Sequence, residues 1–202
     1  MFPLGTVLFP TMVLPLHVFE PRYRALVQDA LATDQEFGVC LIERGHEVGG
    51  GDVRSDVGTI AQIVDAQELP DGRWAVAAVG TRRFRVRAWL DDDPYPRAEI
   101  DDWLDPPAAD ADAATARRDA VVDQLRMVLA LQTESGMPAA PATTEIDADP
   151  ALASYQVAAL APFGPFDGQR LLSAESVDAR LGLLADLLDE AEQDLRRNLE
   201  LG

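Results

Sequence analysis

Residues 14–23 read Leu-Pro-Leu-His-Val-Phe-Glu-Pro-Arg-Tyr, and this stretch decides how the chain begins to fold. The residues leading into it are short β-branched and apolar runs broken by two prolines, which strands tolerate only at edges and bulges. Pro21 has the fixed φ that suits the first position of a helix. The stretch therefore predicts strands over residues 6–9 and 12–18, the second of which turns directly into a helix.

The residues that follow predict that helix and a series of strands. Apolar side chains at helical spacing extend the helix over residues 21–32. The glycine-rich residues 45–56 predict a mobile loop, and Pro-Asp-Gly at 70–72 is typical of a hairpin turn. This pattern indicates a small mixed barrel or folded sheet over residues 1–104. Its further strands are expected over residues 37–42, 57–69, 74–90 and 98–104.

The composition changes at Asp105. Residues 105–116 consist mainly of Pro, Ala and Asp and predict a linker or a helix start, while residues 117–202 predict helices. Asp149 and Pro150 are suited to begin one of them. The last helix shows a nearly unbroken apolar stripe, formed by Val177, Leu181, Leu184, Leu188, Ala191 and Leu195. The predicted fold class is α+β, with a β-rich subdomain followed by an all-α helical bundle.

The charge balance excludes several classes of function. The chain carries 35 acidic and 17 basic residues, which gives a net charge of −18. Because this charge repels the phosphates of nucleic acid, we expect nucleic acid to be a disfavoured binding partner. All basic residues are arginine. Without lysine there is no Walker A phosphate loop, no Ser-Lys dyad and no Schiff-base residue. We therefore expect no ATPase or peptidase activity, and no cofactor.

Cysteine usage and hydropathy predict a cytoplasmic protein without a membrane segment. No apolar run approaches the roughly 20 residues needed to cross a bilayer, and the N-terminus does not resemble a signal peptide. The single cysteine, Cys40, fits a reducing compartment. Because it lies in an apolar run, we expect a buried side chain rather than a nucleophile. His17 and His46 show no metal-ligand spacing with it, so no metal site is predicted.

The stretch at 14–23 permits two interpretations. His17, Glu20 and Arg22 could form a polar ligand pocket, or the stretch could specify a strand-to-helix corner with Phe19 and Tyr23 packed in the interior. We favour the structural interpretation, because segments rich in Pro and aromatic residues usually specify geometry. The residues concerned are Pro15, His17, Phe19, Glu20, Pro21, Arg22 and Tyr23.

The second polar pattern is an arginine strand. Residues 81–88 alternate, so that Arg83, Arg85 and Arg87 are expected on the face opposite Phe84 and its neighbours. Such a face could contact RNA phosphates. With a net charge of −18, we favour pairing of these arginines with the acidic surplus of the same molecule.

Several of these segments resemble the N-terminal domain of the ATP-dependent Lon protease, and the resemblance spans nearly the whole chain. The most specific segment is 14–23, and the others are Phe2-Pro3-Leu4, Val7-Leu8-Phe9-Pro10, Phe37-Gly38-Val39, 57–61, 69–73, 80–86, 169–172 and Arg180-Leu181. Thr11 departs from the pattern, since family members often have Gly after Phe-Pro.

The resemblance implies a β-rich subdomain of a barrel type related to RNA-binding PUA domains, followed by a helical bundle. It further implies a free-standing substrate-handling domain without ATPase or peptidase modules. We expect a non-catalytic module that binds unfolded polypeptide or a dedicated protein partner. Peptide binding of this kind would use exposed apolar grooves and loops. The candidates are the loop at 45–56 and the segment 163–166.

Overall fold

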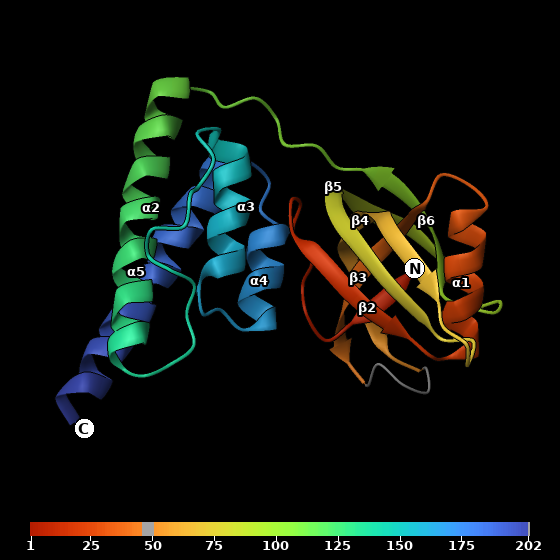
Figure 1. The fold of residues 1–202 in the computed structure, drawn as a ribbon. Helices are drawn as coiled ribbons and strands as arrows, with labels where there is room; N and C mark the ends of the chain where they lie inside the picture. Colours follow the sequence, from red (N-terminus) through yellow and green to blue (C-terminus); the bar gives the residue numbers. More distant parts are fainter. Residues whose placement is uncertain (46–50, 202) are drawn as a thin grey trace. The chain divides into compact units, whose positions relative to one another are not determined.

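A computed structural model describes residues 1–45 and 51–201. The chain divides into two compact units, Met1–Leu104 and Asp105–Gly202, and each has its own set of buried apolar side chains. The first contains all of the strands and one helix, and the second contains only helices among its described residues (Figure 1). The predicted α+β class, with a β-rich part followed by a helical part, is confirmed.

The first unit is built on one mixed sheet of six strands. Its order is β1-β3-β4-β5-β2, with β6 also paired to β5. Among the strand pairs of the described residues, the β1–β3 pair is parallel and the others are antiparallel. The long β5 pairs with β2 through its first half and with β6 through its second half. In the order given above, which we call the main path of the sheet, β1 and β2 are the two end strands. The strands are β1 (Phe2–Leu4), β2 (Val13–Val18), β3 (Glu36–Arg44), β4 (Val53–Glu68), β5 (Trp74–Leu90) and β6 (Arg97–Asp102).

Helix α1 (Pro21–Leu31) contributes one side of the core of this unit. Its apolar residues fall at helical spacing, so that they share a face and are buried together with side chains of β1, β3, β4 and β5. Pro21 occupies the first turn, as its fixed φ predicts. The buried side chains of α1 are Tyr23, Leu26, Val27 and Ala30.

Two glycines allow the strands to approach closely inside the first unit. A Cβ at Gly58 would lie 2.2 Å from the carbonyl oxygen of Val39 and 2.4 Å from the ring of Phe84. A Cβ at Gly80 would lie 2.3 Å from the carbonyl oxygen of Phe9. Any side chain at either position would displace backbone, so the close approach of the chain at these two points depends on glycine.

The described residues of the second unit form four helices, and an aspartate caps the start of each of the first two. Asp110 accepts a hydrogen bond from the backbone of Ala113 at 3.0 Å, and Asp149 caps the next helix at 2.8 Å from the backbone N–H of Ala151. The predicted stripe of the last helix is buried except for Ala191, which is half-buried. The helices are α2 (Ala111–Glu134), α3 (Pro150–Leu160), α4 (Pro165–Leu172) and α5 (Val177–Leu201).

A buried arginine anchors the start of the helical unit. Arg180 of α5 is fully buried, and its guanidinium donates to both carboxylate oxygens of Asp105 at 3.1 and 2.7 Å. It also donates to Ser154 Oγ at 2.8 Å and lies 4.0 Å from the ring centroid of Tyr155. Residues 105–110 precede α2 and are therefore tied to α5 by a desolvated, bidentate ion pair.

Two strand predictions are wrong. Residues 6–9 form no strand, although Val7, Leu8 and Phe9 are buried; the first strand is Phe2–Leu4 instead. The segment 6–9 has no regular structure and is held in part by the hydroxyl of Thr59, which donates to the carbonyl oxygen of Leu8 at 2.6 Å. Residues 53–56, predicted within a loop, begin β4 because they pair with the end of β3.

Candidate functional site

The strand-to-helix corner forms where β2 ends at Val18 and α1 begins at Pro21. The carbonyl oxygen of Glu20 accepts the backbone N–H groups of Tyr23 and Arg24 at 3.1 and 3.0 Å, which closes the first turn of the helix. The Nε of Arg22 donates to the Glu20 carboxylate at 3.1 Å. Its guanidinium carbon lies 4.5 Å from the Tyr23 ring centroid. Glu20, Arg22 and Tyr23 thus fix one another at the corner.

The two aromatic residues of the corner have opposite environments. Tyr23 is 4% exposed and stacks on Phe2 with 4.3 Å between the ring centroids. Burial, as the largest cause, raises the pKa of Tyr23 to about 12. Phe19, which we expected to be packed, is 56% exposed, so that prediction is wrong. The side chain at 19 lies on the surface because α1 begins two residues later and buries Tyr23 instead.

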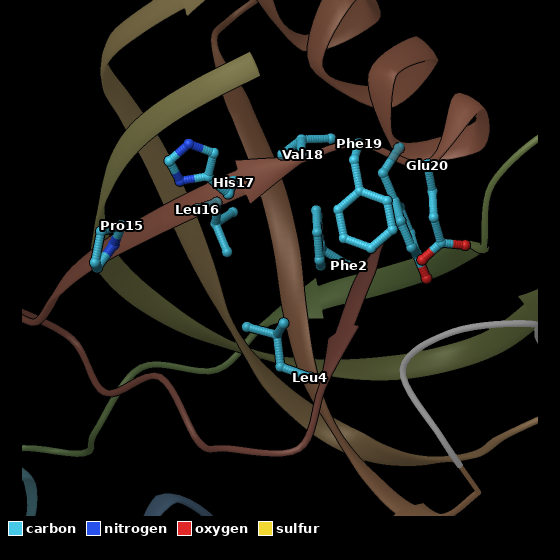
Figure 2. Close-up of a pocket in the computed structure, with 9 residues that line it drawn as sticks. Phe2, Leu4, Pro15, Leu16, His17, Val18, Phe19 and Glu20 are labelled. Atoms are coloured by element: carbon cyan, nitrogen blue, oxygen red, sulfur yellow. The ribbon is translucent and has the colours of Figure 1, made fainter. Parts of the chain in front are cut away.

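A pocket of about 220 Å³ opens at this corner (Figure 2). Its walls come from β1, from β2 and from the first turn of α1, so it lies between the two strands that end the main path of the sheet. Both apolar and polar atoms line it, and Glu20 and His17 are the residues of the lining with ionisable side chains besides Tyr23. The lining residues are Phe2, Leu4, Pro15, Leu16, His17, Val18, Phe19, Glu20 and Tyr23.

The pocket gathers most of the 14–23 motif and two residues that sequence reasoning did not assign to it. Of the motif residues named from the sequence, Pro21 and Arg22 are not among its lining residues. Phe2 and Leu4 were recognised only as part of a family pattern, and the parallel pairing of β1 with β3 brings them here. Such a long-range pairing leaves no local signal in the sequence.

The arginine strand does not form a uniform solvent-facing surface. Arg83, expected on the exposed face, is 2% exposed, and its guanidinium lies 4.1 Å from the ring centroid of Trp103. Arg85 is exposed and lies 3.5 Å from the same centroid, and Arg87 pairs with Asp101. Arg83 and Arg85 therefore share a face, as the alternation predicts, but Arg83 is buried and only Arg85 is exposed beside Trp103, which lies just after β6.

The neighbouring Arg82 is paired with two acidic side chains. Its guanidinium donates to both oxygens of Glu36 at 2.7 and 2.8 Å, and its Nε donates to Asp102 at 3.0 Å. Acidic partners within the first unit therefore hold several of the basic groups in this region. The pairing that we favoured from the charge balance is seen directly at Arg82 and Arg87.

Cys40 is 2% exposed, and burial is the largest cause that raises the pKa of its thiol to about 12. The thiol therefore stays protonated and is a poor nucleophile at neutral pH. No group of three or more His, Cys, Asp or Glu suited to a metal ion occurs within residues 1–45 and 51–201. His46 and the centre of the glycine-rich loop lie outside the described residues.

The helical unit presents a second pocket, of about 290 Å³, where residues 105–108 lie against the starts of α2, α3 and α5. Small residues and prolines form most of its walls. In the segment 163–166, Phe166 is 66% exposed and Phe163 is half-buried. No helix in the described part of the chain combines the length and the apolar character needed to span a bilayer.

Among known proteins, the chain is similar to Lon proteases. It is 30% identical over 189 residues to Lon protease 2 of Herpetosiphon aurantiacus, covering 93% of this chain and 23% of that protein. It is 29% identical over 196 residues to Lon protease 2 of Myxococcus xanthus, covering 95% of this chain and again 23% of that protein. The chain thus spans about a quarter of the length of these curated relatives.

Solved structures agree with this similarity. The fold matches a Lon N-terminal domain protein from Xanthomonas campestris with a TM-score of 0.65, 28% identity and coverage of 92% of this chain and 95% of that one. The N-terminal domain of the Mycobacterium avium complex Lon protease shares the fold, with a TM-score of 0.64 at 19% identity over 93% and 96% of the two chains. A family model matches residues 1–190, and the chain accordingly belongs to the family described as the ATP-dependent protease La (LON) substrate-binding domain.

Proposed function

We propose that this chain is a non-catalytic module that binds unfolded polypeptide at the pocket between β1, β2 and α1. One observation carries the proposal. Phe19 leaves 56% of a large apolar side chain in water beside a pocket that Phe2, Leu4 and Leu16 also line, whereas Phe2 and Tyr23 are buried. An exposed aromatic residue next to a cavity is a common feature of surfaces that capture apolar side chains. The family description, a substrate-binding domain, supports the same function.

The non-catalytic part of the proposal rests on the chemistry available in the chain. No lysine is present for a phosphate loop or a Ser-Lys dyad. The matched portion of the Lon relatives is 23% of their length. We place the protein in the cytoplasm because its one cysteine is suited to a reducing compartment.

The test is fluorescence anisotropy with a labelled basic protein that is kept unfolded by reduction and S-carboxamidomethylation. The folded, disulfide-bonded form of the same protein is the control. We expect selective binding of the unfolded form, and we expect Phe19→Ala to weaken it by about tenfold, as loss of one interface aromatic residue does.

Phe166→Ala is the matched control, because this phenylalanine is 66% exposed on the helical unit. It should leave binding unchanged. Binding that depends on Phe166 and not on Phe19 would move the site to the segment 163–166. Equal binding of the folded and unfolded forms, or of neither, would reject recognition of unfolded polypeptide.

A scaffold for one dedicated protein partner is the second candidate, and the same exposed corner supports it. Such a partner would be recovered by affinity capture with the wild-type chain and lost with Phe19→Ala. RNA binding through Arg83, Arg85 and Arg87 is less well supported, since Arg83 is buried and Arg87 is paired with Asp101. Tight, salt-sensitive RNA binding abolished by Arg85→Ala would nevertheless favour it.

A further inference from the structure

The strand that forms one wall of the pocket has a free edge. Within the described residues, β2 pairs only with β5, and it ends the main path of the sheet. Its outward side chains are exposed, including Val13 at 63%. An unpaired edge presents backbone donors and acceptors that another extended chain can use.

The hydrogen-bond pattern shows which residues of β2 present these groups. The N–H of Gly80 donates to the carbonyl oxygen of Met12 at 2.9 Å. Because antiparallel pairs alternate, the hydrogen-bonded pairs that follow are Leu14 with Ala78 and Leu16 with Val76. The residues between them turn their backbone groups away from β5. These are Val13, Pro15 and His17.

The free edge therefore has a defined chemical pattern. Val13 and His17 each offer one N–H donor and one carbonyl acceptor, while Pro15 offers only its carbonyl. No hydrogen bond to these outward groups occurs in the described part of the chain. The donor that is missing at Pro15 interrupts a continuous ladder, a feature that limits aggregation at exposed edges.

The pocket lies beside this edge. Consecutive residues from Pro15 to Glu20 line it, together with Phe2 and Leu4 of β1 (Figure 2). A chain paired with β2 would place every second side chain toward this cavity. Backbone pairing and apolar side-chain capture would then occur in one binding event.

The charge of the first unit indicates which kind of polypeptide would bind at the free edge of β2. Residues 1–104 carry 17 acidic and 10 basic side chains, and the whole chain has a net charge of −18. Two copies of this chain would repel each other, whereas a basic segment would be attracted. The complementary ligand is an extended segment that alternates apolar and basic residues, with the apolar ones directed into the pocket.

We propose that an extended, basic and apolar polypeptide segment adds to the free edge of β2 as a further strand, with alternate side chains entering the pocket lined by Phe2, Leu4 and Phe19. This inference rests on the proposed function and specifies how the polypeptide is held. Recognition through backbone groups tolerates many sequences, and the pocket supplies the preference for apolar side chains.

The first test changes the ligand and leaves the protein intact. The probe is a fluorescein-labelled octapeptide, Arg-Leu-Arg-Val-Arg-Leu-Arg-Val, with two derivatives that are N-methylated on the odd or on the even backbone amides. In a paired strand only alternate amides face β2. We expect one methylation pattern to weaken binding by more than tenfold and the other to have little effect. Equal effects of the two patterns would overturn strand addition.

The second test removes one donor of the protein. His17→Pro deletes an outward N–H without removing a bond to β5, and Pro15 shows that β2 accepts proline at such a position. His17→Ala removes the same side chain but keeps the N–H. Affinity for the octapeptide should be about three- to tenfold lower for His17→Pro than for His17→Ala. Circular dichroism and tryptophan fluorescence confirm that both variants are folded.

The outcomes separate the two proposals. Binding of the unfolded protein that depends on Phe19, together with equal effects of the two methylated peptides, would retain the function and reject strand addition. No binding of either probe would reject both. A concentration-dependent dimer that is lost in His17→Pro, seen by analytical ultracentrifugation, would instead identify a second copy as the occupant of the edge.

Discussion

At the scale of single residues, the structure explains positions that composition alone left ambiguous. Thr11, which departs from the glycine common in the family, adopts φ 74°. Its N–H donates to the carbonyl oxygen of Gly80 at 2.8 Å, which holds the turn between the segment 6–9 and β2. A β-branched residue in the left-handed region is strained, so the fold tolerates Thr11 at a cost of about 1–3 kcal/mol.

The first prediction concerns this strain. Thr11→Gly should raise the free energy of unfolding by about 1 kcal/mol, because glycine adopts a positive φ freely and the relief of strain exceeds the added entropy of the unfolded chain. Urea denaturation followed by tryptophan fluorescence measures the change. A destabilised variant would show that contacts of the Thr11 side chain outweigh its backbone strain.

The second prediction concerns Cys40. Its folded pKa of about 12 exceeds the roughly 8.5 of a free thiol, so the unfolded state loses its proton first as the pH rises. The stability contributed by the neutral thiol is complete below about pH 8.5 and declines above it. Between pH 8.5 and 9.5 the free energy of unfolding should fall by about 1 kcal/mol from this residue alone. Denaturation of the wild type and of Cys40→Ala at both values provides the check, since the difference between the two proteins separates the thiol from Tyr23 and Tyr95, whose pKa values are also raised.

At the scale of the elements, replacing a glycine has opposite effects in a closely packed strand and in an exposed part of a helix. Gly58 lies in β4, where a Cβ would overlap the carbonyl oxygen of Val39 and the ring of Phe84. Gly182 lies in α5 with no atom near the position of a Cβ. One glycine is required by the packing of the sheet, and the other only weakens a helix.

These two glycines give matched substitutions of opposite sign. Gly58→Ala should destabilise the first unit by about 2 kcal/mol or more, because the backbone must move to accept the methyl group. Gly182→Ala should stabilise the helical unit by about 0.5–1 kcal/mol through helix propensity. Urea titrations of both variants decide the point. Equal effects would mean that the close contacts at Gly58 relax easily.

At the scale of the whole molecule, the chain has two cores that can be observed separately. All three tryptophans lie in residues 1–104, so their fluorescence reports on the first unit. Four of the five helices lie in the second unit, so the helical circular dichroism signal reports mainly on it. Stability changes can therefore be assigned to one unit.

We predict that the two units respond independently to core substitutions. Leu188→Ala, at a fully buried position of α5, should cost about 2–5 kcal/mol and lower the midpoint seen by circular dichroism, without a shift in tryptophan fluorescence. Ile63→Ala, 4% exposed in the first core, should do the reverse. Parallel shifts of both signals in either variant would show that the chain unfolds as one cooperative unit.

The sequence by itself determined the features that depend on neighbouring residues. The hairpin at 70–72, the start of α1 at Pro21, the cap at Asp149 and the buried stripe of α5 all follow from local backbone preference and periodicity. The family pattern around 14–23 was interpreted from the sequence as a structural corner, and the peptide-binding candidates were placed elsewhere, at 45–56 and 163–166; that the corner also lines the candidate pocket was not predicted.

Only the tertiary structure decided which side chains the solvent reaches. It exposed Phe19, buried Arg83 beneath Trp103, and brought Phe2 and Leu4 to the pocket that β2 also lines. Each result depends on residues far apart in the sequence that meet when the sheet forms. Exposure is set by what packs against a residue from elsewhere in the chain, and an alternating or aromatic pattern carries no information about that partner.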